Sequence, residues 1–358
     1  MAKIDAFFNL MIELGASDLH LASGQPPMVR INGEIERINY PAFDSDILKQ
    51  LVYEIATEEK IKVFEETGDV DFAYEIPKLS RFRVNFFNQI RGIAAVFRVI
   101  PSKILTLDDL NLPPVLAKLC FLENGLVLVT GPTGSGKSTT LAAMIDKVNK
   151  SKKRHILTIE DPVEFVHKPM LCSINHREVG VHTKSFTSAL KGALREDPDI
   201  ILVGEMRDLE TISLALEAAS TGHLVFGTLH TQSAPKTIDR IIDVFPADEQ
   251  EKTRISLAES LKGIVAQSLL RKKEGGRIAA LEILFCNTAV ANLIRERKTH
   301  QIATIMQTQK KLGMTLLDDV LEELLQADII TAESAYEKAN NKEKFVKYLK
   351  NPPDALLS

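Results

Sequence analysis

Cysteine is scarce in this sequence, with three residues among 358, at Cys120, Cys172 and Cys286. They are odd in number and far apart, and no pair has the spacing of a metal site or a disulfide framework. We therefore predict buried, reduced thiols. We also predict no structural zinc, because a four-ligand site within one chain would need several added His or carboxylate ligands.

Long hydrophobic runs are absent as well. The longest, 126–129 and 200–203, have the length of a strand, whereas a helix that crosses a bilayer needs about 20 apolar residues. The first residues do not resemble a signal peptide, because Asp5 and Glu13 interrupt apolar positions that recur at helical spacing. These positions predict an amphipathic helix, and they are Ile4, Phe7, Phe8, Met11 and Leu14. We expect no direct insertion into a membrane, so any membrane contact would go through a protein partner.

An excess of positive charge is also missing, since the formal net charge is −4. A nucleic-acid-binding protein usually carries a basic surface, so this balance argues against a nucleic-acid partner. The length favours two domains, and the composition is ordinary for a globular protein that buries a sizeable core.

The part of the chain up to about residue 99 has the pattern of an antiparallel sheet. Apolar and polar residues alternate there with a period of two, which predicts strands. The predicted strands are 28–31, 34–38, 70–74, 82–86 and 93–99. Asn32-Gly33 predicts a tight hairpin turn, and Pro77-Lys78 predicts a second turn. Helical stretches precede and interrupt these strands, so residues 1–99 are predicted to form a small α+β domain.

A linker is predicted at residues 100–114, where Thr106 and Asp109 fit the capping box of a short helix. From 115 to 358, apolar strand-like runs alternate with helices. This order predicts an α/β domain with a mostly parallel sheet that is covered on both faces. We expect the last hundred residues to be mainly helical.

A complete phosphate-loop pattern follows the predicted strand 126–129. Its residues are Gly131, Pro132, Thr133, Gly134, Ser135, Gly136, Lys137, Ser138 and Thr139. Glycines let backbone N–H groups close around phosphates, and the positive end of the following helix assists them. We predict that Lys137 reaches the β- and γ-phosphates of ATP, that Ser138 holds Mg²⁺ and that Thr139 lies near the α-phosphate.

Further candidate catalytic residues surround three later strands. Glutamates follow the strands 156–159 and 200–203, and a histidine stands on each side of the strand 224–227. These residues are Glu160, Glu164, Glu205, His223 and His230. The carboxyl ends of parallel strands meet at one edge of a sheet. We therefore expect the side chains that follow the strands to converge on the nucleotide.

Phosphoryl transfer needs the charge of the γ-phosphate neutralised and a water placed in line with it. Lys137 and Mg²⁺ supply the first requirement, and Glu160, Glu164 or Glu205 supplies the second. Many P-loop ATPases carry an Asp where this chain has Gly204. We therefore expect Glu205 to act on Mg²⁺ partly through water, and the choice of catalytic base stays open.

Four segments resemble motifs of the secretion-superfamily ATPases. Residues 155–165 resemble their Asp box, and 199–208 resemble their atypical Walker B motif, in which glycine is usual at position 204. Residues 221–231 resemble their His box, and 15–20 resemble a motif near the N-terminus. The similarity covers nearly the whole chain, and within the family it is strongest to the ATPases that retract type IV pili.

The resemblance implies a PAS-like N-terminal domain, a RecA-like ATPase domain and a ring of six identical subunits that drives twitching motility. It implies ATP and Mg²⁺ as cofactors, and a cytoplasmic position at the base of the pilus machine. It implies an inner-membrane platform protein and an accessory paralogue as partners. Neighbouring subunits would contribute arginines to the nucleotide, and the candidates here are Arg81, Arg83 and Arg98. Alternation places Arg81 and Arg83 opposite the phenylalanines of their strand, so ordinary solvated arginines remain the alternative.

Other functions stay open beside the retraction motor. Residues 289–296 resemble a C-terminal motif of retraction ATPases, but Ala291 replaces its first arginine, which leaves an accessory retraction ATPase as an alternative. A pilus-extension or type II secretion ATPase typically carries two CxxC pairs, which this sequence lacks. A GTP switch would need a guanine-reading NKxD motif, and 149–152 and 341–344 lack its Asp. A ring component without turnover is disfavoured by the intact Lys137, Glu205 and His230.

The segment 289–296 also predicts a helix with one apolar stripe. Val290, Leu293 and Ile294 have the spacing of such a stripe. We expect the stripe to pack against the ATPase core. Arg295 and Glu296 are then exposed, and their alternative roles are coupling hydrolysis to movement and an ordinary solvated charge pair.

Overall fold

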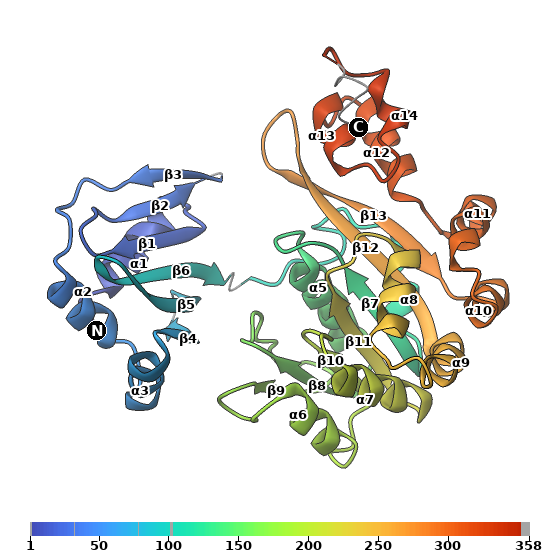
Figure 1. Ribbon diagram of the computed structural model, residues 1–358, viewed down its shortest axis with the longest axis horizontal. Coiled ribbons are helices and arrows are strands. Elements are labelled where there is room, and N and C mark those ends of the chain that lie inside the picture. The colour runs from blue at the N-terminus through green and yellow to red at the C-terminus, as the bar shows by residue number, and fades with distance from the viewer. Residues whose placement is uncertain (1, 32, 78, 101–102, 352–358) are drawn as a thin grey trace. The chain divides into compact units, whose positions relative to one another are not determined.

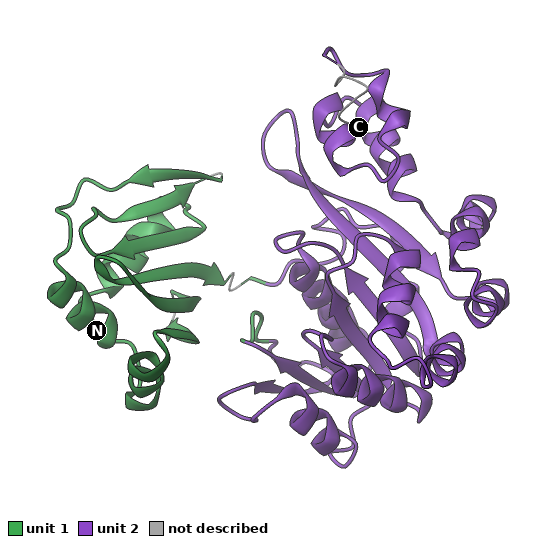
Figure 2. Ribbon diagram, in the orientation of Figure 1, with its two compact units in different colours: residues 1–103, 162–166 green, residues 104–161, 167–358 purple. Residues whose placement is uncertain are grey.

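The structure, a computed structural model, describes residues 2–31, 33–77, 79–100 and 103–351. The chain divides into two compact units (Figure 2), of which unit 1 comprises residues 1–103 and 162–166 and unit 2 comprises the remainder. The division after residue 103 falls inside the predicted linker, whose residues 101 and 102 lie outside the described part. Thr106 and Asp109 exchange the bonds of the predicted capping box, at 2.9 and 3.0 Å, but the residues after Thr106 form a turn rather than a helix.

Unit 1 is built on a six-stranded antiparallel sheet in the order β3-β2-β1-β6-β5-β4 (Figure 1). Its strands are β1 (Asp18–Ala22), β2 (Met28–Ile31), β3 (Glu34–Arg37), β4 (Asp69–Ile76), β5 (Ser80–Gln89) and β6 (Gly92–Ile100). Its helices are α1 (Asp5–Glu13), α2 (Ser45–Tyr53) and α3 (Glu58–Thr67). The central strand β1 is missing from the predicted strands, and the other five are confirmed. The turn residues Asn32 and Lys78 lie outside the described residues.

The two faces of this sheet differ because side chains alternate along each strand. On β5, Phe82 and Phe86 are buried on the helix-covered face, and the ring of Phe8 from α1 stacks on Phe82 at a centroid distance of 4.4 Å. Arg81 and Arg83 alternate with these residues and are partly exposed. The predicted amphipathic first helix and the predicted α+β domain are therefore confirmed.

Unit 2 is an α/β domain around a seven-stranded sheet in the order β13-β12-β7-β11-β10-β8-β9, in which the pair β12–β13 is antiparallel and the other neighbours are parallel. Its strands are β7 (Gly125–Thr130), β8 (His155–Glu160), β9 (Ser173–Glu178), β10 (Ile200–Val203), β11 (Leu224–Leu229), β12 (Leu261–Arg271) and β13 (Arg277–Phe285). Its helices are α4 (Leu116–Cys120), α5 (Lys137–Ser151), α6 (Phe186–Ala193), α7 (Leu209–Ser220), α8 (Ala234–Asp243), α9 (Gln250–Ser260), α10 (Thr288–Arg295), α11 (Ile302–Thr308), α12 (Leu317–Gln326), α13 (Ala332–Lys338) and α14 (Glu343–Val346), with short 3₁₀ helices η1 (Thr299–Gln301) and η2 (Lys310–Leu312).

Helices cover both faces of the central strands (Figure 1). α4 and α5 pack on one face, where Leu141 and Val148 belong to the same buried cluster as Val129 of β7. α6, α7 and α9 pack on the other face, where Leu216 belongs to the same buried cluster as Leu128 of β7. The predicted mostly parallel, doubly covered sheet is confirmed. Burial on both faces explains why its strands have continuous apolar sequences.

The prediction of a mainly helical last hundred residues is wrong for residues 261–285. These residues form β12 and β13, a long antiparallel pair at one side of the sheet. The turn between the strands contains Gly275 and Gly276, with φ angles of 89 and 76°. Two glycines between apolar runs are a hairpin signal, because glycine adopts the positive φ angles that occur in tight turns without strain. The end of this hairpin near Leu270 packs with α12 to α14, which are helical as predicted.

Candidate functional site

The phosphate loop (residues 131–136) joins β7 to α5. Gly131, Gly134 and Gly136 have φ angles of 141, 77 and 87°, a region that glycine adopts without strain. A Cβ at position 131 would lie 2.2 Å from the backbone oxygen of Gln267. Both the conformation and the available space therefore require glycine. The loop has the strand–loop–helix context that phosphate binding needs.

The first turn of α5 contains Lys137, Ser138 and Thr139. The Lys137 ammonium folds back on the loop and donates to the carbonyl oxygens of Gly131 and Pro132, at 2.8 and 3.1 Å. Lys137 is the first residue of α5. It therefore lies at the helix N-terminus, where backbone N–H groups favour an anion.

Two buried hydroxyl groups belong to the same region. Within the described part of the chain, the Thr130 and Ser135 hydroxyls have no hydrogen-bond partner. Buried polar groups are costly unless a water or a ligand satisfies them. Both hydroxyls lie next to the loop, where a water or a bound phosphate would satisfy them.

Three more strand ends share the edge of the sheet that carries the loop. The order β7-β11-β10-β8 brings together, in sequence across this carboxyl edge, the phosphate loop, His230, Glu205 and Glu160. Neighbouring strands lie about 4.8 Å apart, so these groups line the edge over about 15 Å. This is the arrangement expected for a ligand that binds across the ends of parallel strands.

Glu205 lies at the centre of the charges on this edge. Its carboxylate accepts a hydrogen bond from Nε2 of His230 at 2.7 Å and forms an ion pair with Arg207. Partial burial raises the pKa of Glu205, but the hydrogen bonds and charges of Arg207 and His230 outweigh this effect and hold the pKa below its usual range. The carboxylate is therefore ionised at neutral pH and suited to organising a cation and its waters.

Gly204 stands before Glu205 because the strands approach closely there. Its N–H donates to the carbonyl oxygen of Ile159 at 2.7 Å. A Cβ at position 204 would lie 3.1 Å from the Cα of Glu160. An aspartate here would press on the backbone of the neighbouring strand, which gives a physical reason for the departure from other P-loop ATPases.

Glu160 contacts a histidine of the outer strand β9. Its carboxylate lies 4.0 Å from Nδ1 of His176. The backbone N–H of His167 donates to Nε2 of His176 at 3.1 Å, while Nδ1 lies 2.8 Å from the Thr158 hydroxyl. Nε2 is thus an acceptor, and the neutral ring carries its proton on Nδ1. The sequence analysis missed His176 because β9 carries no recognisable motif, and only its pairing with β8 brings it here.

A groove of about 400 Å³ lies beside Glu205. Its charged and polar members are Glu205, Arg207, His230, Thr231 and Arg240, and its apolar members include Met206, Ile212, Leu229 and Val244. A groove of this volume with a few convergent polar groups is typical of a small-molecule site.

Two candidate catalytic residues are not brought into this cluster. His223 precedes β11, and its Nδ1 lies 3.1 Å from the carbonyl oxygen of Ala218. The whole of β11 separates it from His230, a span of roughly 20 Å, as expected for a residue that precedes a parallel strand rather than follows it. Glu164 belongs to residues 162–166, which group with unit 1, so it is not among the side chains that unit 2 brings together.

The three candidate arginines lie in unit 1, on the sheet face opposite the phenylalanines. Arg83 and Arg98 are cross-strand partners on β5 and β6, and Arg81 precedes Arg83 by two residues on β5. Arg98 donates to the buried Asp18 at 2.8 Å, and Arg83 pairs with Asp71 at 3.5 Å. Carboxylates of the same sheet therefore hold Arg83 and Arg98 in place.

The apolar stripe predicted for residues 289–296 is confirmed by helix α10. Val290 and Ile294 are fully buried, and Leu293 packs against the same core. Arg295 and Glu296 are exposed and bond to nearby surface side chains.

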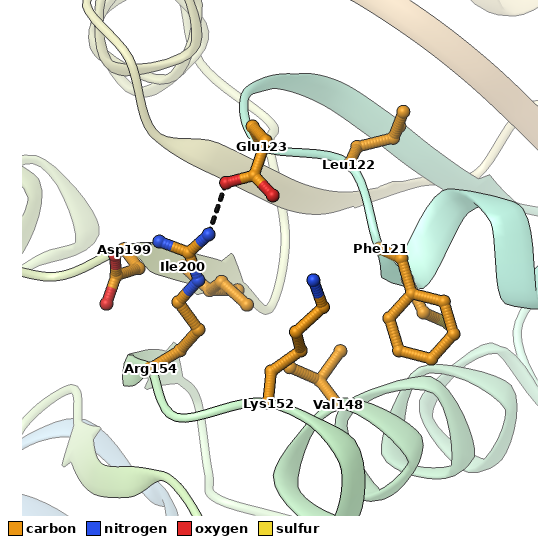
Figure 3. A pocket seen from close by; sticks show the side chains of 9 residues that line it. Phe121, Leu122, Glu123, Val148, Lys152, Arg154, Asp199 and Ile200 are labelled. Carbon is orange, nitrogen blue, oxygen red and sulfur yellow. Dashed lines mark hydrogen bonds and ion pairs between the residues drawn. The ribbon is translucent and has the colours of Figure 1, made fainter.

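A second, much smaller pocket lies at the amino edge of the same sheet (Figure 3). Arg154 pairs there with Glu123 and, at 2.7 Å, with Asp199, and Lys152 points into the space between Arg154 and Phe121. The cavity has a volume of about 10 Å³, which is room for one water. Arg154 is thus paired with both carboxylates, and the cavity has no space for a nucleotide.

Other structural expectations concern the cysteines, metals and membranes. The three cysteines are free, and burial raises the pKa of the Cys120 thiol to about 12 and that of Cys286 to about 11. Across the described ranges, no set of three or more His, Cys, Asp and Glu side chains is arranged to hold a metal ion. None of the helices among the described residues is both long enough and apolar enough to span a bilayer.

The sheet, the phosphate loop and the acidic and histidine side chains at the neighbouring strand ends define a RecA-like P-loop ATPase. The chain belongs to the type II/IV secretion system protein family (T2SSE), whose family model matches residues 1–337. The predicted family, fold class and ATPase activity are thereby confirmed.

Individual relatives agree with this family. The chain is 55% identical over 331 residues to the type IV pilus retractation ATPase PilT of Pseudomonas aeruginosa, which covers 92% of this chain and 96% of that protein. It is 38% identical over 340 residues to the type IV pilus ATPase PilU of the same organism, with coverages of 95% and 89%. A crystal structure of the pilus retraction motor PilT with bound ADP has a TM-score of 0.88 at 47% identity, covering 96% of this chain and 98% of that one.

Proposed function

We propose that this chain is an ATP-driven motor that retracts type IV pili and so powers twitching motility. The observation that carries the proposal is the 2.7 Å contact of Glu205 with His230 at the strand ends beside an intact phosphate loop. It occurs in a chain 55% identical to a pilus retraction ATPase. A PilU-like accessory retraction ATPase is the second candidate. This second candidate is weaker, because the identity to PilU is 38%. It is retained because Ala291 replaces the first arginine of the C-terminal motif of retraction ATPases.

In this proposal, the backbone N–H groups of residues 131–136 surround the phosphates of ATP. The Lys137 ammonium exchanges its two loop carbonyls for oxygens of the β- and γ-phosphates, and Thr139 lies near the α-phosphate. Mg²⁺ prefers oxygen ligands, and the Ser138 hydroxyl and the Glu205 carboxylate, the latter partly through water, fit it. When bound, the cation neutralises phosphate charge.

The attacking water needs a carboxylate to orient it, and three are available. The pKa of Glu205 is lowered, which makes it a weak base, because a good general base has a pKa near the working pH. This favours Glu160 or Glu164 as the group that orients the water. Glu205 and His230 then arrange the charges around the γ-phosphate.

We further propose that the chain works as a homohexamer in the cytoplasm, at the base of the pilus machine. A PilC-like inner-membrane platform protein and a PilU-like paralogue are the expected partners. Arg81, Arg83 and Arg98 are the candidates for arginines that act on the nucleotide of a neighbouring subunit. Such an arginine is worth about 10³ to 10⁵ in rate. Mixing Glu205→Ala protein with Arg81→Ala protein should therefore restore turnover if sites are shared, and a fully active monomer would exclude the idea.

The ATP site is tested by turnover of the purified full chain. Lys137→Ala and Glu205→Ala should both lose hydrolysis, and Glu205→Ala should still bind ATP. The matched control is Glu251→Ala, which removes an exposed ion pair with Arg297 on the surface and should leave turnover unchanged. Near-normal rates in both site variants would refute the assignment.

The motor function is tested in cells. Changing Arg295 and Glu296 to Ala should leave ATP turnover and ring assembly intact, because both side chains are exposed and the buried stripe of α10 is untouched. Pilus retraction and twitching should nevertheless fall if this surface transmits movement. Unchanged motility at normal protein levels would restrict the segment to a structural role.

A further inference from the structure

A residue far from the phosphate-loop motif supports the loop from within the domain. Gln267 of β12 is 4% exposed. Its Nε2 donates to the carbonyl oxygen of Ser135 at 2.6 Å, and its Oε1 accepts from the Thr140 hydroxyl at 2.7 Å. A carbonyl oxygen only accepts, so the first bond fixes the orientation of the amide. Gln267 thus ties the loop to the first turns of α5 across sequence separations of 132 and 127 residues.

The bond to Ser135 determines which way one peptide group of the loop faces. In a planar trans peptide, the C=O and the following N–H point in opposite directions. Because the Ser135 carbonyl is held toward Gln267 in the interior, the N–H of Gly136 is directed away from it, toward the open side of the loop.

Two glycines of the loop lie so close to Gln267 that a side chain at either position would collide with it. Gly136 has a φ of 87°, and a Cβ there would lie 2.9 Å from Nε2 of Gln267. A Cβ at Gly131 would collide with the backbone oxygen of Gln267, at 2.2 Å. The loop and β12 are therefore in close contact on both sides of the Ser135 carbonyl.

We infer that Gln267 is a positioning residue for ATP binding, which holds the peptide between Ser135 and Gly136 so that its N–H faces the phosphates. Gln267 acts through the loop and needs no contact with the nucleotide. A hydrogen bond from an N–H to a charged phosphate contributes about 10- to 100-fold in affinity. The inference rests on the proposed ATP site.

Two substitutions at this position remove the support in different ways. Gln267→Leu removes both hydrogen bonds and leaves the Ser135 carbonyl free to rotate. Gln267→Glu keeps the size and the acceptor for Thr140, but it sets an oxygen against the Ser135 carbonyl. The matched control is Ser268→Ala, which changes the next buried residue of β12, on the opposite side of the strand.

The measurements are the Kd of ADP by calorimetry and the kcat and KM of ATP turnover, all on the folded full chain. Gln267→Leu and Gln267→Glu should raise the ADP Kd and the KM for ATP about 10- to 100-fold, with a much smaller change in kcat, since the loss is in nucleotide binding. Amide hydrogen exchange of residues 134–137 should speed up in both variants. Ser268→Ala should match the wild type in every readout.

A second pair of variants keeps the test independent of the Gln267 side chain, should its replacement prevent folding. Thr140→Val removes the hydroxyl that holds Oε1 and should weaken ADP binding, whereas Thr140→Ser keeps the hydroxyl and should restore it. If the wild-type chain hydrolyses ATP and the folded variants bind ADP within about twofold of its affinity, the inference about Gln267 is overturned. The proposed ATP site would then still stand. A wild-type chain that binds no ADP would instead defeat the proposed ATP site, and this inference with it.

Discussion

The two edges of the seven-stranded sheet carry charge clusters of similar composition. At the carboxyl edge, Glu205 contacts His230 at 2.7 Å. At the amino edge, Arg154 pairs with Glu123 and with Asp199. The first cluster borders a groove of about 400 Å³, and the second borders a cavity of about 10 Å³. A cluster of opposite charges is therefore no sign of a ligand site until the space beside it is known.

Helix α5 explains much of the difference between these edges, because its two ends carry opposite partial charges. Its N-terminus lies at the carboxyl edge and favours an anion, so the phosphate loop belongs there. Its C-terminus lies at the amino edge and favours cations, and Lys152 and Arg154 follow it directly. The same helix thus prepares one edge for a phosphate and stabilises basic side chains at the other.

The largest expected effect is a loss of ATP turnover that occurs when the carboxyl edge is changed and does not occur when the amino edge is changed. Glu205→Gln should lower ATP turnover by about 100-fold or more, the usual loss when a group that arranges charge around the transition state is removed, while ATP binding changes little. The measurement is single-turnover hydrolysis beside calorimetric binding. Equal losses of turnover in Glu205→Gln and in the amino-edge variant Arg154→Met would erase the distinction between the edges.

A smaller effect concerns the helix that starts beside the carboxyl edge. The Asp208 carboxylate caps α7 by accepting from the Thr211 N–H at 2.9 Å. Asp208→Ala should lower the free energy of unfolding by about 1 kcal/mol, and the control Asp208→Asn, which retains a capping oxygen, should lose little. Partial burial raises the pKa of Asp208, but hydrogen bonds, the one from the Thr211 N–H first, hold the pKa below its ordinary value of 3.8.

The lowered pKa gives this cap a pH dependence of known sign. A carboxyl whose pKa is lowered on folding contributes stability above its unfolded pKa and loses it as the pH falls through the folded pKa. Denaturant titrations should therefore show the gap between wild type and Asp208→Ala above pH 3.8 and its disappearance below. A gap that persists at lower pH would contradict the charge-dependent part of the cap.

A substitution at the amino edge should lower the stability of the fold and leave ATP turnover unchanged. Arg154→Met breaks the pairs with Glu123 and Asp199, and since these side chains are about a third exposed or more, the loss in unfolding free energy should be about 1 kcal/mol or less. ATP turnover should stay within about twofold of wild type, because no edge residue that faces the nucleotide is changed. Thermal melts and steady-state rates measured on one sample would check both outcomes.

The smallest expected effect is an absence of reaction at the amino edge. Cys120 lines the small cavity, and burial raises the pKa of its thiol to about 12. At pH 8, iodoacetamide should therefore leave Cys120 unmodified in the folded chain and modify it after denaturation, since the thiolate is the reactive form. Mass spectrometry of both samples checks this, and rapid labelling of the folded chain would show that the cavity opens.

The parts of the fold that the sequence predicted are those with a local pattern. Alternation predicted five strands of unit 1, and apolar runs between helices predicted the parallel core of unit 2. β9 was missed because its polar sequence has no alternation, and β12 with β13 was missed although Gly275 and Gly276 mark their turn. These strands take their form from pairing with β8 and β7, and that pairing is a long-range contact that a short window of sequence does not contain.

The sequence by itself determined the phosphate loop, because glycine spacing and helix start are set by backbone geometry within a few residues. It also determined that Glu205 and His230 share an edge, since parallel strands align their carboxyl ends. Only the tertiary structure brought His176 to Glu160 and set Gln267 beneath the loop. Those placements depend on strand order and on packing between segments distant in sequence, and no local pattern specifies either.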